Sequence, residues 1–161
     1  MGLVVSLDEA KRIRTEARTA GKRVVLTNGY FDLLHVGHVR YLRAARALGD
    51  LLIVALNADS TARRAKDPRR PIVGEANRAE VLAALACVDC VVVFEEDTAE
   101  RVVSLLRPDI YAKGGDYDEG TLPEAPVVQQ YGGKVRLLPF EAGHSTTGIV
   151  ETILERYVPR P

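Results

Sequence analysis

Short apolar runs alternate with amphipathic stretches along the chain. These runs are rich in β-branched and aliphatic residues, which favour strands. They comprise RVVLTN (23–28), LLIVALN (51–57), CVVVF (90–94), DIYAK (109–113) and KVRLLPF (134–140). Their continuous apolarity, in place of strict alternation, indicates strands that are covered on both faces, as in a parallel sheet. The pattern therefore predicts an α/β fold in which a parallel sheet lies between layers of helices.

The stretches between these runs predict helices. Ser6 and Glu9 form a capping box that opens the first helix, and Gly21 ends it. The other helices are expected at 36–48, 58–65, 75–86, 98–107, 121–131 and 145–157. The length of 161 residues suits one domain. We expect a single domain over 1–161, with an N-terminal helix at 1–21 and a core at 22–157.

Composition narrows the class of protein. Lys plus Arg and Asp plus Glu number 22 each, so no strong overall field attracts nucleic acid. No apolar run approaches the roughly 20 residues that a membrane span needs, so we expect no membrane protein. The N-terminal residues turn charged almost at once and lack the features of a secretory signal, which predicts a cytoplasmic protein. The expected ligand is a small molecule.

Cys87 and Cys90 form a C-x-x-C. They stand at the entry to an apolar run rather than at an exposed strand-to-helix turn, which favours buried, unreactive thiols over a redox site. A zinc site needs two further ligands, and no second Cys or His pair has a suitable spacing. We therefore expect no metal ligands among the protein's side chains.

The segment FDLLHVGH (31–38) carries two of the chain's three histidines. It follows the first strand of the alternation, at the sheet edge where α/β proteins bind ligands. The spacing of His35 and His38 points both the same way in the first turn of the next helix, and Gly37 leaves room for a ligand. Free N–H groups, the helix dipole and two imidazole donors suit phosphoryl oxygens. Zinc is the weaker alternative, because no third ligand is obvious.

The common phosphate-binding loops are missing from the sequence. It lacks both G-x-x-x-x-G-K-[ST] and G-x-G-x-x-G, which disfavours P-loop NTPases and dinucleotide redox enzymes. It also lacks an obvious nucleophile–base pair for hydrolysis. Attack of a substrate phosphate on a nucleotide α-phosphate needs none of these, because a phosphate is already ionised at neutral pH. Such a site orients two anions in line and neutralises the charge that builds on the bridging oxygens.

Four spaced motifs carry a family resemblance. GYFDLLHVGH resembles the H-x-G-H signature of the nucleotidyltransferase superfamily. Together, TNGYFDLLHVGHVRYLRAARALGDLLIVALNAD, FEEDT, YAKGGDY and GHSTTGIV resemble the adenylyltransferase domain of bifunctional heptose kinase/adenylyltransferases over residues 22–157. The resemblance implies a Rossmann-like three-layer sandwich with a five-stranded parallel sheet. It also implies transfer of AMP from ATP to a sugar 1-phosphate, with D-glycero-β-D-manno-heptose 1-phosphate as the expected substrate, giving ADP-sugar and pyrophosphate.

The resemblance further assigns roles to residues. His35 and His38 are expected to contact the ATP phosphates and stabilise the transition state, while Lys66 and Arg78 bind phosphates. The residues implied in nucleotide binding are Asn28, Gly29, Tyr30, Phe31, Asp32, Gly37, Lys113, Gly114, Gly115, Asp116, Ser145, Thr146 and Thr147, with Asp116 at ribose or metal. Taken alone, the basic loop 63–74 reads as a solvated surface loop, the glycine pair as a strand-end turn, and Ser145 as an N-cap.

The resemblance also concerns cofactors and partners. It implies Mg²⁺ bridging the leaving phosphates, and relatives of this kind are commonly homodimers. No kinase half accompanies the four motifs in this sequence. A separate sugar kinase is therefore expected to supply the phosphorylated substrate.

Departures from the family pattern keep two other functions open. Tyr30 stands where a small residue is usual, Asp67-Pro68 follows Lys66 where glycine is usual, and His144 precedes the Ser-Thr-Thr element. A cytidylyltransferase for a polyol phosphate such as glycerol 3-phosphate is one alternative, and comparing CTP with ATP separates it. The other is a nucleotide-binding regulatory module that has lost turnover. The retained histidine pair disfavours this alternative.

Overall fold

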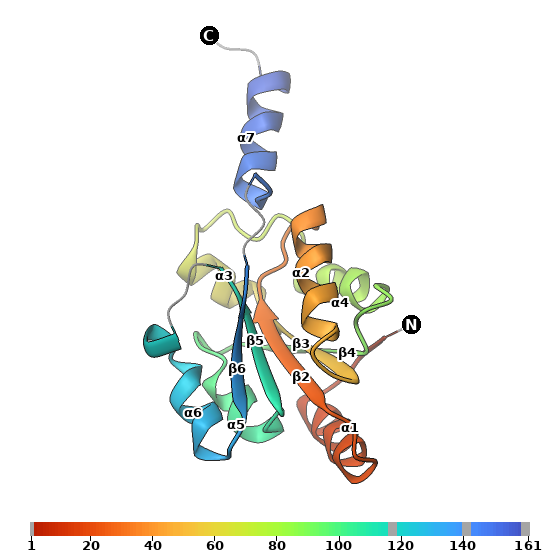
Figure 1. Ribbon diagram of the computed structural model, residues 1–161. Coiled ribbons are helices and arrows are strands. Elements are labelled where there is room, and N and C mark those ends of the chain that lie inside the picture. Colours follow the sequence, from red (N-terminus) through yellow and green to blue (C-terminus); the bar gives the residue numbers. More distant parts are fainter. Residues whose placement is uncertain (1, 116–118, 140–142, 159–161) are drawn as a thin grey trace.

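The computed structural model describes residues 2–115, 119–139 and 143–158 and contains a parallel sheet (Figure 1). The strand order is β1-β4-β3-β2-β5-β6, and every pairing is parallel. The strands are β1 (Leu3–Val4), β2 (Val24–Gly29), β3 (Leu51–Asn57), β4 (Cys90–Phe94), β5 (Ile110–Gly114) and β6 (Lys134–Leu138). The predicted Rossmann-like α/β sandwich is thereby confirmed.

The expectation of five strands is corrected to six within the described residues. The additional strand, β1, is two residues long and pairs with β4 at the edge of the sheet. Both of its side chains are exposed. A strand this short shows neither the buried run nor the alternation by which the other strands were predicted.

The helices fall close to their predicted ranges. They are α1 (Leu7–Thr19), α2 (Val36–Arg46), α3 (Asp59–Ala65), α4 (Glu75–Ala83), α5 (Glu100–Leu106), α6 (Glu124–Gln130) and α7 (Thr146–Tyr157), with a 3₁₀ turn at Glu119–Thr121. The Ser6 hydroxyl accepts a hydrogen bond from the Glu9 amide at 3.2 Å, as the capping box requires. None of these helices is long and apolar enough to cross a membrane.

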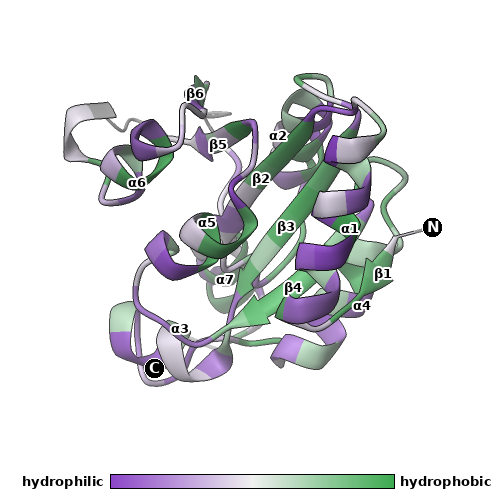
Figure 2. Ribbon diagram, turned by 90° about the horizontal axis from the view of Figure 1, so that it is seen from below, coloured by the Kyte–Doolittle hydropathy of each residue, from purple (hydrophilic) through white to green (hydrophobic). Residues whose placement is uncertain are grey.

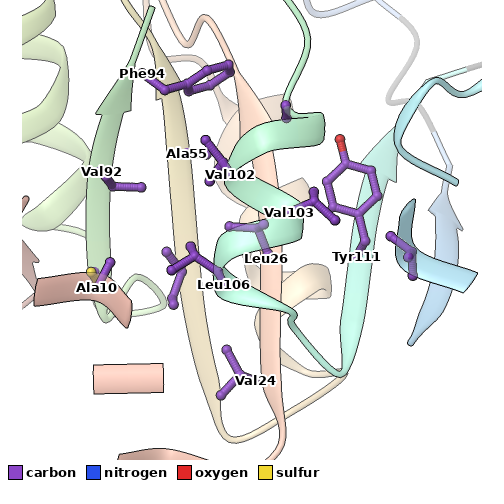
Figure 3. Packing of buried hydrophobic residues seen from close by; sticks show 14 of the residues in the cluster. Ala10, Val24, Leu26, Ala55, Val92, Phe94, Val102, Val103, Leu106 and Tyr111 are labelled. Carbon is purple, nitrogen blue, oxygen red and sulfur yellow. The ribbon is translucent and has the colours of Figure 1, made fainter. Parts of the chain in front are cut away.

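The core has two layers, one on each face of the sheet. Alternate strand residues such as Leu26, Ala55 and Val92 pack under α1, α5 and α6. Figure 3 shows these three side chains beside the helix α5. Their neighbours, such as Val54 and Val91, pack under α2 and α4. The view from below shows these apolar strands between the helices (Figure 2). Burial on both faces explains why the strand sequences read as unbroken apolar runs.

The topology indicates at which end of the strands a ligand binds. From the central β2 the chain builds outward through β3 and β4, and then returns to place β5 on the other side of β2. The direction of winding therefore reverses between β2 and β5, and such a switch point opens a crevice at the carboxyl ends of the strands. Here β2 ends at Asn28 and Gly29, and β5 ends at Lys113 and Gly114.

The two cysteines are free thiols. Cys90 is fully buried in β4, and burial raises its pKa to about 12. Cys87 is half-buried, and its pKa is also raised, chiefly by burial. A raised pKa keeps a thiol protonated at neutral pH and therefore a poor nucleophile. Both thiols fit the unreactive role expected from the sequence.

The last helix, α7, stands away from the body of the molecule (Figure 1). None of its described residues is buried. Apolar side chains along it are open to solvent, among them Ile153, Leu154 and Tyr157. Its first residues nevertheless lie against the start of α2, since Thr146 Oγ1 is 3.5 Å from the Leu33 carbonyl oxygen.

Candidate active site

The two histidines of the H-x-G-H motif lie face to face at the start of α2. His35 is the N-cap residue and His38 the third residue of the helix, so only His38 is in the first turn. Their rings stack with centroids 3.8 Å apart, and Phe31 meets the His38 ring edge-on at 5.2 Å. Both side chains are half-buried rather than enclosed. Their Nδ1 atoms are buried and have no hydrogen-bond partner among the described residues, which leaves hydrogen-bonding capacity for a ligand.

The third histidine of the chain joins this pair. His144 lies parallel to His35, with ring centroids 6.4 Å apart. No role was predicted for His144 from the sequence, where its position directly before Ser145 was the one available signal. Gly37 lies between the rings: a Cβ atom there would sit 3.0 Å from His35 Nδ1 and 3.2 Å from His144 Cβ. A glycine at this position therefore lets His35 and His144 approach without displacement.

The two stacked imidazoles are neutral at neutral pH. Burial, followed by the neighbouring His35, lowers the pKa of His38 to about 4. Burial and then His144 lower the pKa of His35 as well. A bound polyanion favours the charged form of an imidazole and so opposes these shifts. The pair is therefore uncharged before a ligand binds, and a bound polyanion would favour its protonation.

The low pKa of His38 predicts a loss of stability in acid. Between pH 6.5 and about 4, the unfolded chain binds a proton at His38 that the folded chain does not. The free energy of unfolding therefore falls as pH decreases through this range and is restored above it. Urea denaturation of the wild type and His38→Gln at about pH 7 and about pH 4.5 tests this. We expect a smaller acid loss in His38→Gln; equal losses would contradict the assignment.

A polar network links the ends of β2 and β5. Asn28 Oδ1 accepts hydrogen bonds from the Tyr111 hydroxyl at 2.6 Å and from Lys113 Nζ at 2.8 Å. Burial lowers the pKa of Lys113, with the charge of Glu124 opposing the shift. The structure thus brings the predicted Asn28 and Lys113 together across the switch point. Tyr111 was not predicted, because nothing distinguishes it from the other residues of a buried strand.

The glycines at the strand ends make room for aromatic side chains. A Cβ atom at Gly29 would lie 2.8 Å from the Phe31 ring, and one at Gly114 would lie 2.7 Å from the Tyr41 ring. Phe31 itself has a left-handed backbone with φ of 44°. Gly115, with φ of 121°, turns the chain away from β5. Asp116, which was predicted at ribose or metal, lies outside the described residues.

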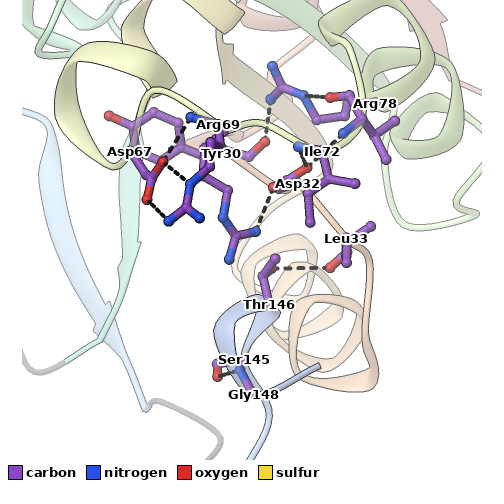
Figure 4. Close-up of polar contacts among 12 residues, drawn as sticks. Tyr30, Asp32, Leu33, Asp67, Arg69, Ile72, Arg78, Ser145, Thr146 and Gly148 are labelled. Carbon is purple, nitrogen blue, oxygen red and sulfur yellow. Dashed lines mark hydrogen bonds and ion pairs between the residues drawn. The ribbon is translucent and has the colours of Figure 1, made fainter. Parts of the chain in front are cut away.

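Asp32 ties the turn after β2 to the basic loop (Figure 4). Its carboxylate accepts hydrogen bonds from the backbone of Ile72 at 2.8 Å and Val73 at 3.0 Å, and pairs with Arg70 at 2.8 Å. Burial raises the pKa of Asp32, but these three hydrogen bonds outweigh it and the pKa lies below its usual value. The carboxylate is therefore ionised and holds the loop in place. Arg70 was not singled out in the sequence.

Lys66 lies on the same loop, above the ring of Tyr30. Its Nζ is 5.5 Å from the ring centroid, within the range of a cation–π contact. The Lys66 side chain is otherwise exposed, so it remains accessible to a ligand. The tyrosine that departs from the family pattern thus faces the lysine that was predicted to bind phosphate.

Arg78 is buried beneath this loop instead of lining an open site. Its side chain is fully buried and pairs with Asp59 at 2.7 Å. Three carbonyl oxygens also accept from its guanidinium: Val73 at 2.8 Å, Asn57 at 3.0 Å, and Tyr30. In this geometry Arg78 holds the loop and the turn together. Its predicted direct contact with phosphate stays a prediction.

The hydroxyl-rich start of α7 reaches the same region. Ser145 is the N-cap, and its hydroxyl accepts from the Gly148 amide at 3.0 Å. Thr146 lies near the Leu33 carbonyl, while Thr147 is exposed. Free N–H groups at a helix start favour anions. The structure therefore places the start of α7 beside Leu33 and, through His144, beside His35.

Metal binding by the protein alone has no support in the described part of the chain. It contains no group of three or more His, Cys, Asp or Glu side chains arranged to hold a metal ion. The alternative of a zinc site at the histidine pair therefore lacks ligands within these residues. A cation at this site would depend mainly on oxygens of a bound ligand.

Gly37 offers a test of the histidine geometry. We expect Gly37→Ala to weaken ATP binding by about tenfold, because the added methyl displaces His35 or His144 from its place in the cluster. Gly74→Ala is the matched control, since its Cβ meets no atom closer than 3.6 Å. Isothermal titration with ATP measures both. Wild-type affinity in Gly37→Ala would show that the spacing of the rings is immaterial.

Comparisons with known proteins agree on the family. A family model described as Cytidylyltransferase-like matches residues 26–151. The chain is 56% identical over 140 residues to the bifunctional protein HldE of Syntrophotalea carbinolica, covering 87% of this chain and 29% of that protein. It is 51% identical over 154 residues to the bifunctional protein HldE of Geobacter sulfurreducens, covering 96% and 31%. The chain thus spans about three tenths of the length of these relatives.

Solved structures support the same fold. The crystal structure of the lipopolysaccharide core biosynthesis protein from Thermoplasma volcanium is 32% identical, with a TM-score of 0.63, and the match covers 75% of this chain and 98% of that one. The pantoate-β-alanine ligase from Francisella tularensis is 14% identical, with a TM-score of 0.65, over 92% and 70% of the two chains. The second likeness concerns the fold alone.

Proposed function

The chain belongs to the cytidylyltransferase-like family, and we propose that it transfers AMP from ATP to a sugar 1-phosphate, giving ADP-sugar and pyrophosphate. The observation that carries this proposal is the stacked pair His35 and His38 at the start of a helix beside the sheet's switch point. This arrangement offers donors for a chain of phosphates without a nucleophilic side chain.

The choice of sugar rests on the relatives. The chain is about half identical to proteins named bifunctional protein HldE, and its motifs resemble heptose adenylyltransferases. A similar structure belongs to a protein of lipopolysaccharide core biosynthesis. We therefore propose D-glycero-β-D-manno-heptose 1-phosphate as the acceptor.

The proposed reaction is an in-line displacement at the α-phosphorus of ATP. An ionised oxygen of the sugar phosphate forms a bond to this phosphorus, while the bond to the bridging oxygen of pyrophosphate breaks. No proton transfer is needed, because both the nucleophile and the leaving group are anions. The task of the protein is to hold the two anions in line and to stabilise the charge that moves onto the leaving oxygens.

Each side chain of the site has a place in this scheme. His35 and His38, with the free amides of α2, donate to the triphosphate, and Lys66 approaches from the basic loop. Arg78 positions the loop and the turn through its bonds to Val73 and Tyr30. The hydroxyls and amides at the start of α7, which lies near Leu33, are proposed to bind the same phosphates. When bound, Mg²⁺ would be held mainly by phosphate oxygens and would neutralise the leaving pyrophosphate.

A nucleotide-by-acceptor matrix tests the proposal. Purified protein is mixed with ATP or CTP, and with heptose 1-phosphate or glycerol 3-phosphate, and pyrophosphate release is followed. We expect release with ATP and heptose 1-phosphate. Release mainly with CTP and glycerol 3-phosphate would show the alternative cytidylyltransferase. ATP binding without release from any pair would indicate a regulatory module and overturn the proposal.

The expected homodimer, the separate sugar kinase and the cytoplasmic location stay predictions. Light scattering on the purified chain measures the first of them. The relatives named bifunctional protein HldE are about three times as long as this chain, so a kinase activity is sought in another polypeptide or another segment.

A further inference from the structure

A cavity lies at the amino ends of the strands, opposite the carboxyl ends where the histidine pair lies. It has a volume of about 890 Å³ and opens at the amino ends of β2, β5 and β6, between the last turns of α1, α5 and α6. Because the strands are parallel, their amino ends lie a full strand length from Asn28 and Lys113. The volume lies within the range of small-molecule sites. No role proposed above involves this cavity.

The walls of this cavity are strongly basic. Its cationic side chains are Arg14, Arg18, Arg23, Arg107, Lys134 and Arg136. The one acidic residue of its lining is Asp109, which accepts a hydrogen bond from the Val24 amide at 2.8 Å. None of the six cations forms an ion pair with another residue that the structure describes. The chain as a whole is neutral, so this concentration of unpaired positive charge is local.

Compensation of helix dipoles does not account for all of this charge. Arg18 is in the last turn of α1, and Arg107 caps the end of α5, where positive charge is favourable. Each helix end carries only about half a negative charge, however, so the nearby helix ends and Asp109 leave a clear positive excess. Arg23 precedes β2, and Lys134 and Arg136 lie on β6. None of the three is in the last turn of a helix, so their charges do not serve to stabilise a helix dipole.

The geometry of Arg107 fixes part of this wall. Its backbone is left-handed, with φ of 43°, at a helix end where glycine is the usual residue. Its carbonyl oxygen accepts hydrogen bonds from Arg14, one of them from Nε at 3.0 Å. Arg14 is buried, and burial lowers its pKa; the charge of Asp109 opposes this shift, while Arg18 and Arg107 add to it. The Arg14 guanidinium is thus held against the backbone of Arg107, at the wall of the cavity.

Tyr131 adds a polar group without a partner. Its hydroxyl oxygen is buried and has no hydrogen bond to any described residue. Burial raises the pKa of Tyr131, so the hydroxyl keeps its proton and remains a donor. Buried hydroxyls in folded proteins nearly always have a partner. A ligand oxygen in the cavity that Tyr131 lines would supply one.

We propose that this cavity binds a phosphorylated small molecule that carries two or more negative charges, separately from the H-x-G-H site. The cations bind its phosphate oxygens, as arginine commonly does in proteins. The Tyr131 hydroxyl donates to one further oxygen. Apolar residues of the lining, such as Leu48, Ile110 and Val127, contact the organic part of the molecule.

Backbone-amide NMR titration of the full chain tests this proposal, because it reports the two sites separately. Inorganic pyrophosphate and ADP are the probes, so that the contribution of the organic part is seen. We expect saturable shifts at the amides of Ser104, Gly132 and Gly133, apart from shifts at Gly37 and His38. A double variant, Arg107→Asn with Lys134→Ala, is expected to weaken binding at the cavity amides by at least tenfold. Asparagine is chosen because it tolerates the left-handed backbone.

The controls separate a specific site from general attraction. Lys11→Ala removes an exposed charge from α1 outside the cavity and is expected to leave the cavity shifts unchanged. Absence of saturable shifts at the cavity amides, or equal weakening by Lys11→Ala, would overturn the proposal. Binding of poly-glutamate but of neither phosphate probe would also overturn it, by showing a surface for an acidic protein segment. Shifts at Gly37 and His38 report the proposed active site independently, so its failure is seen separately.

Discussion

His38→Ala is expected to lower the rate of nucleotidyl transfer by roughly 10²–10³-fold, the loss typical of one well-placed donor to a developing anion. His38 is the residue of the pair within the helix, and its ring is held between His35 and Phe31. These contacts fix the imidazole before substrate arrives, so little reorganisation is needed during the reaction. Steady-state pyrophosphate release with saturating ATP and sugar phosphate measures the loss.

The same substitution has a smaller effect on stability. The His38 ring is half-buried and contacts two rings, so the loss of folding stability is expected to be about 1–2 kcal/mol. His144→Ala serves as the control, because its ring is 6.4 Å from His35 and is not stacked on His38. Its rate loss is expected to be no more than about tenfold. A His38→Ala enzyme with wild-type turnover would remove the central role given to the histidine pair.

Arg78→Met is expected to destabilise the fold by about 3–5 kcal/mol, a large share of the 5–15 kcal/mol by which a domain of this kind is stable. The guanidinium is fully buried and satisfies Asp59 and three backbone carbonyl groups. Methionine fills a similar volume but leaves these buried acceptors without a donor. Urea denaturation at neutral pH measures the loss, provided that the slope is unchanged.

Two further variants sharpen this test. Arg78→Lys retains the charge but cannot reach acceptors on several sides at once, so it is expected to lose most of the same stability. Arg43→Met makes the same substitution at an exposed position of α2 and should change stability by no more than about 0.5 kcal/mol. If Arg78→Met lost no more stability than Arg43→Met, the hydrogen bonds of Arg78 around the loop would not stabilise the fold.

The sequence was informative wherever burial imposed a simple pattern. The central strands and their helices were predicted within a few residues, because burial on both faces gives unbroken apolar runs. The place of the histidine pair followed from the position of FDLLHVGH directly after the first of these strands. The edge strand β1 was missed, since Leu3 and Val4 are too few to form a pattern.

The parts that escaped prediction depend on contacts between distant segments. Arg78 reads as one more charge on an amphipathic helix, and only the fold shows it buried against Tyr30 and Asn57. The bond of Tyr111 to Asn28 joins residues 83 positions apart. Arg70 stands in a run of basic residues that composition assigns to solvent. Propensity and periodicity describe neighbours along the chain and contain no record of such pairings.

Because α7 buries none of its described residues, it lacks the tertiary support that keeps most protein helices formed. A 12-residue helix in this situation is marginal in water. The unfolding and refolding of α7 is therefore nearly independent of the rest of the fold. Its backbone amides are expected to exchange their hydrogens with solvent before those of the other helices. If Ser145 and Thr146 contact phosphate as predicted, nucleotide affinity depends on the coil-to-helix equilibrium of this segment. Substitutions on the solvent side of α7 that alter helix propensity will tune that affinity without touching the nucleotide.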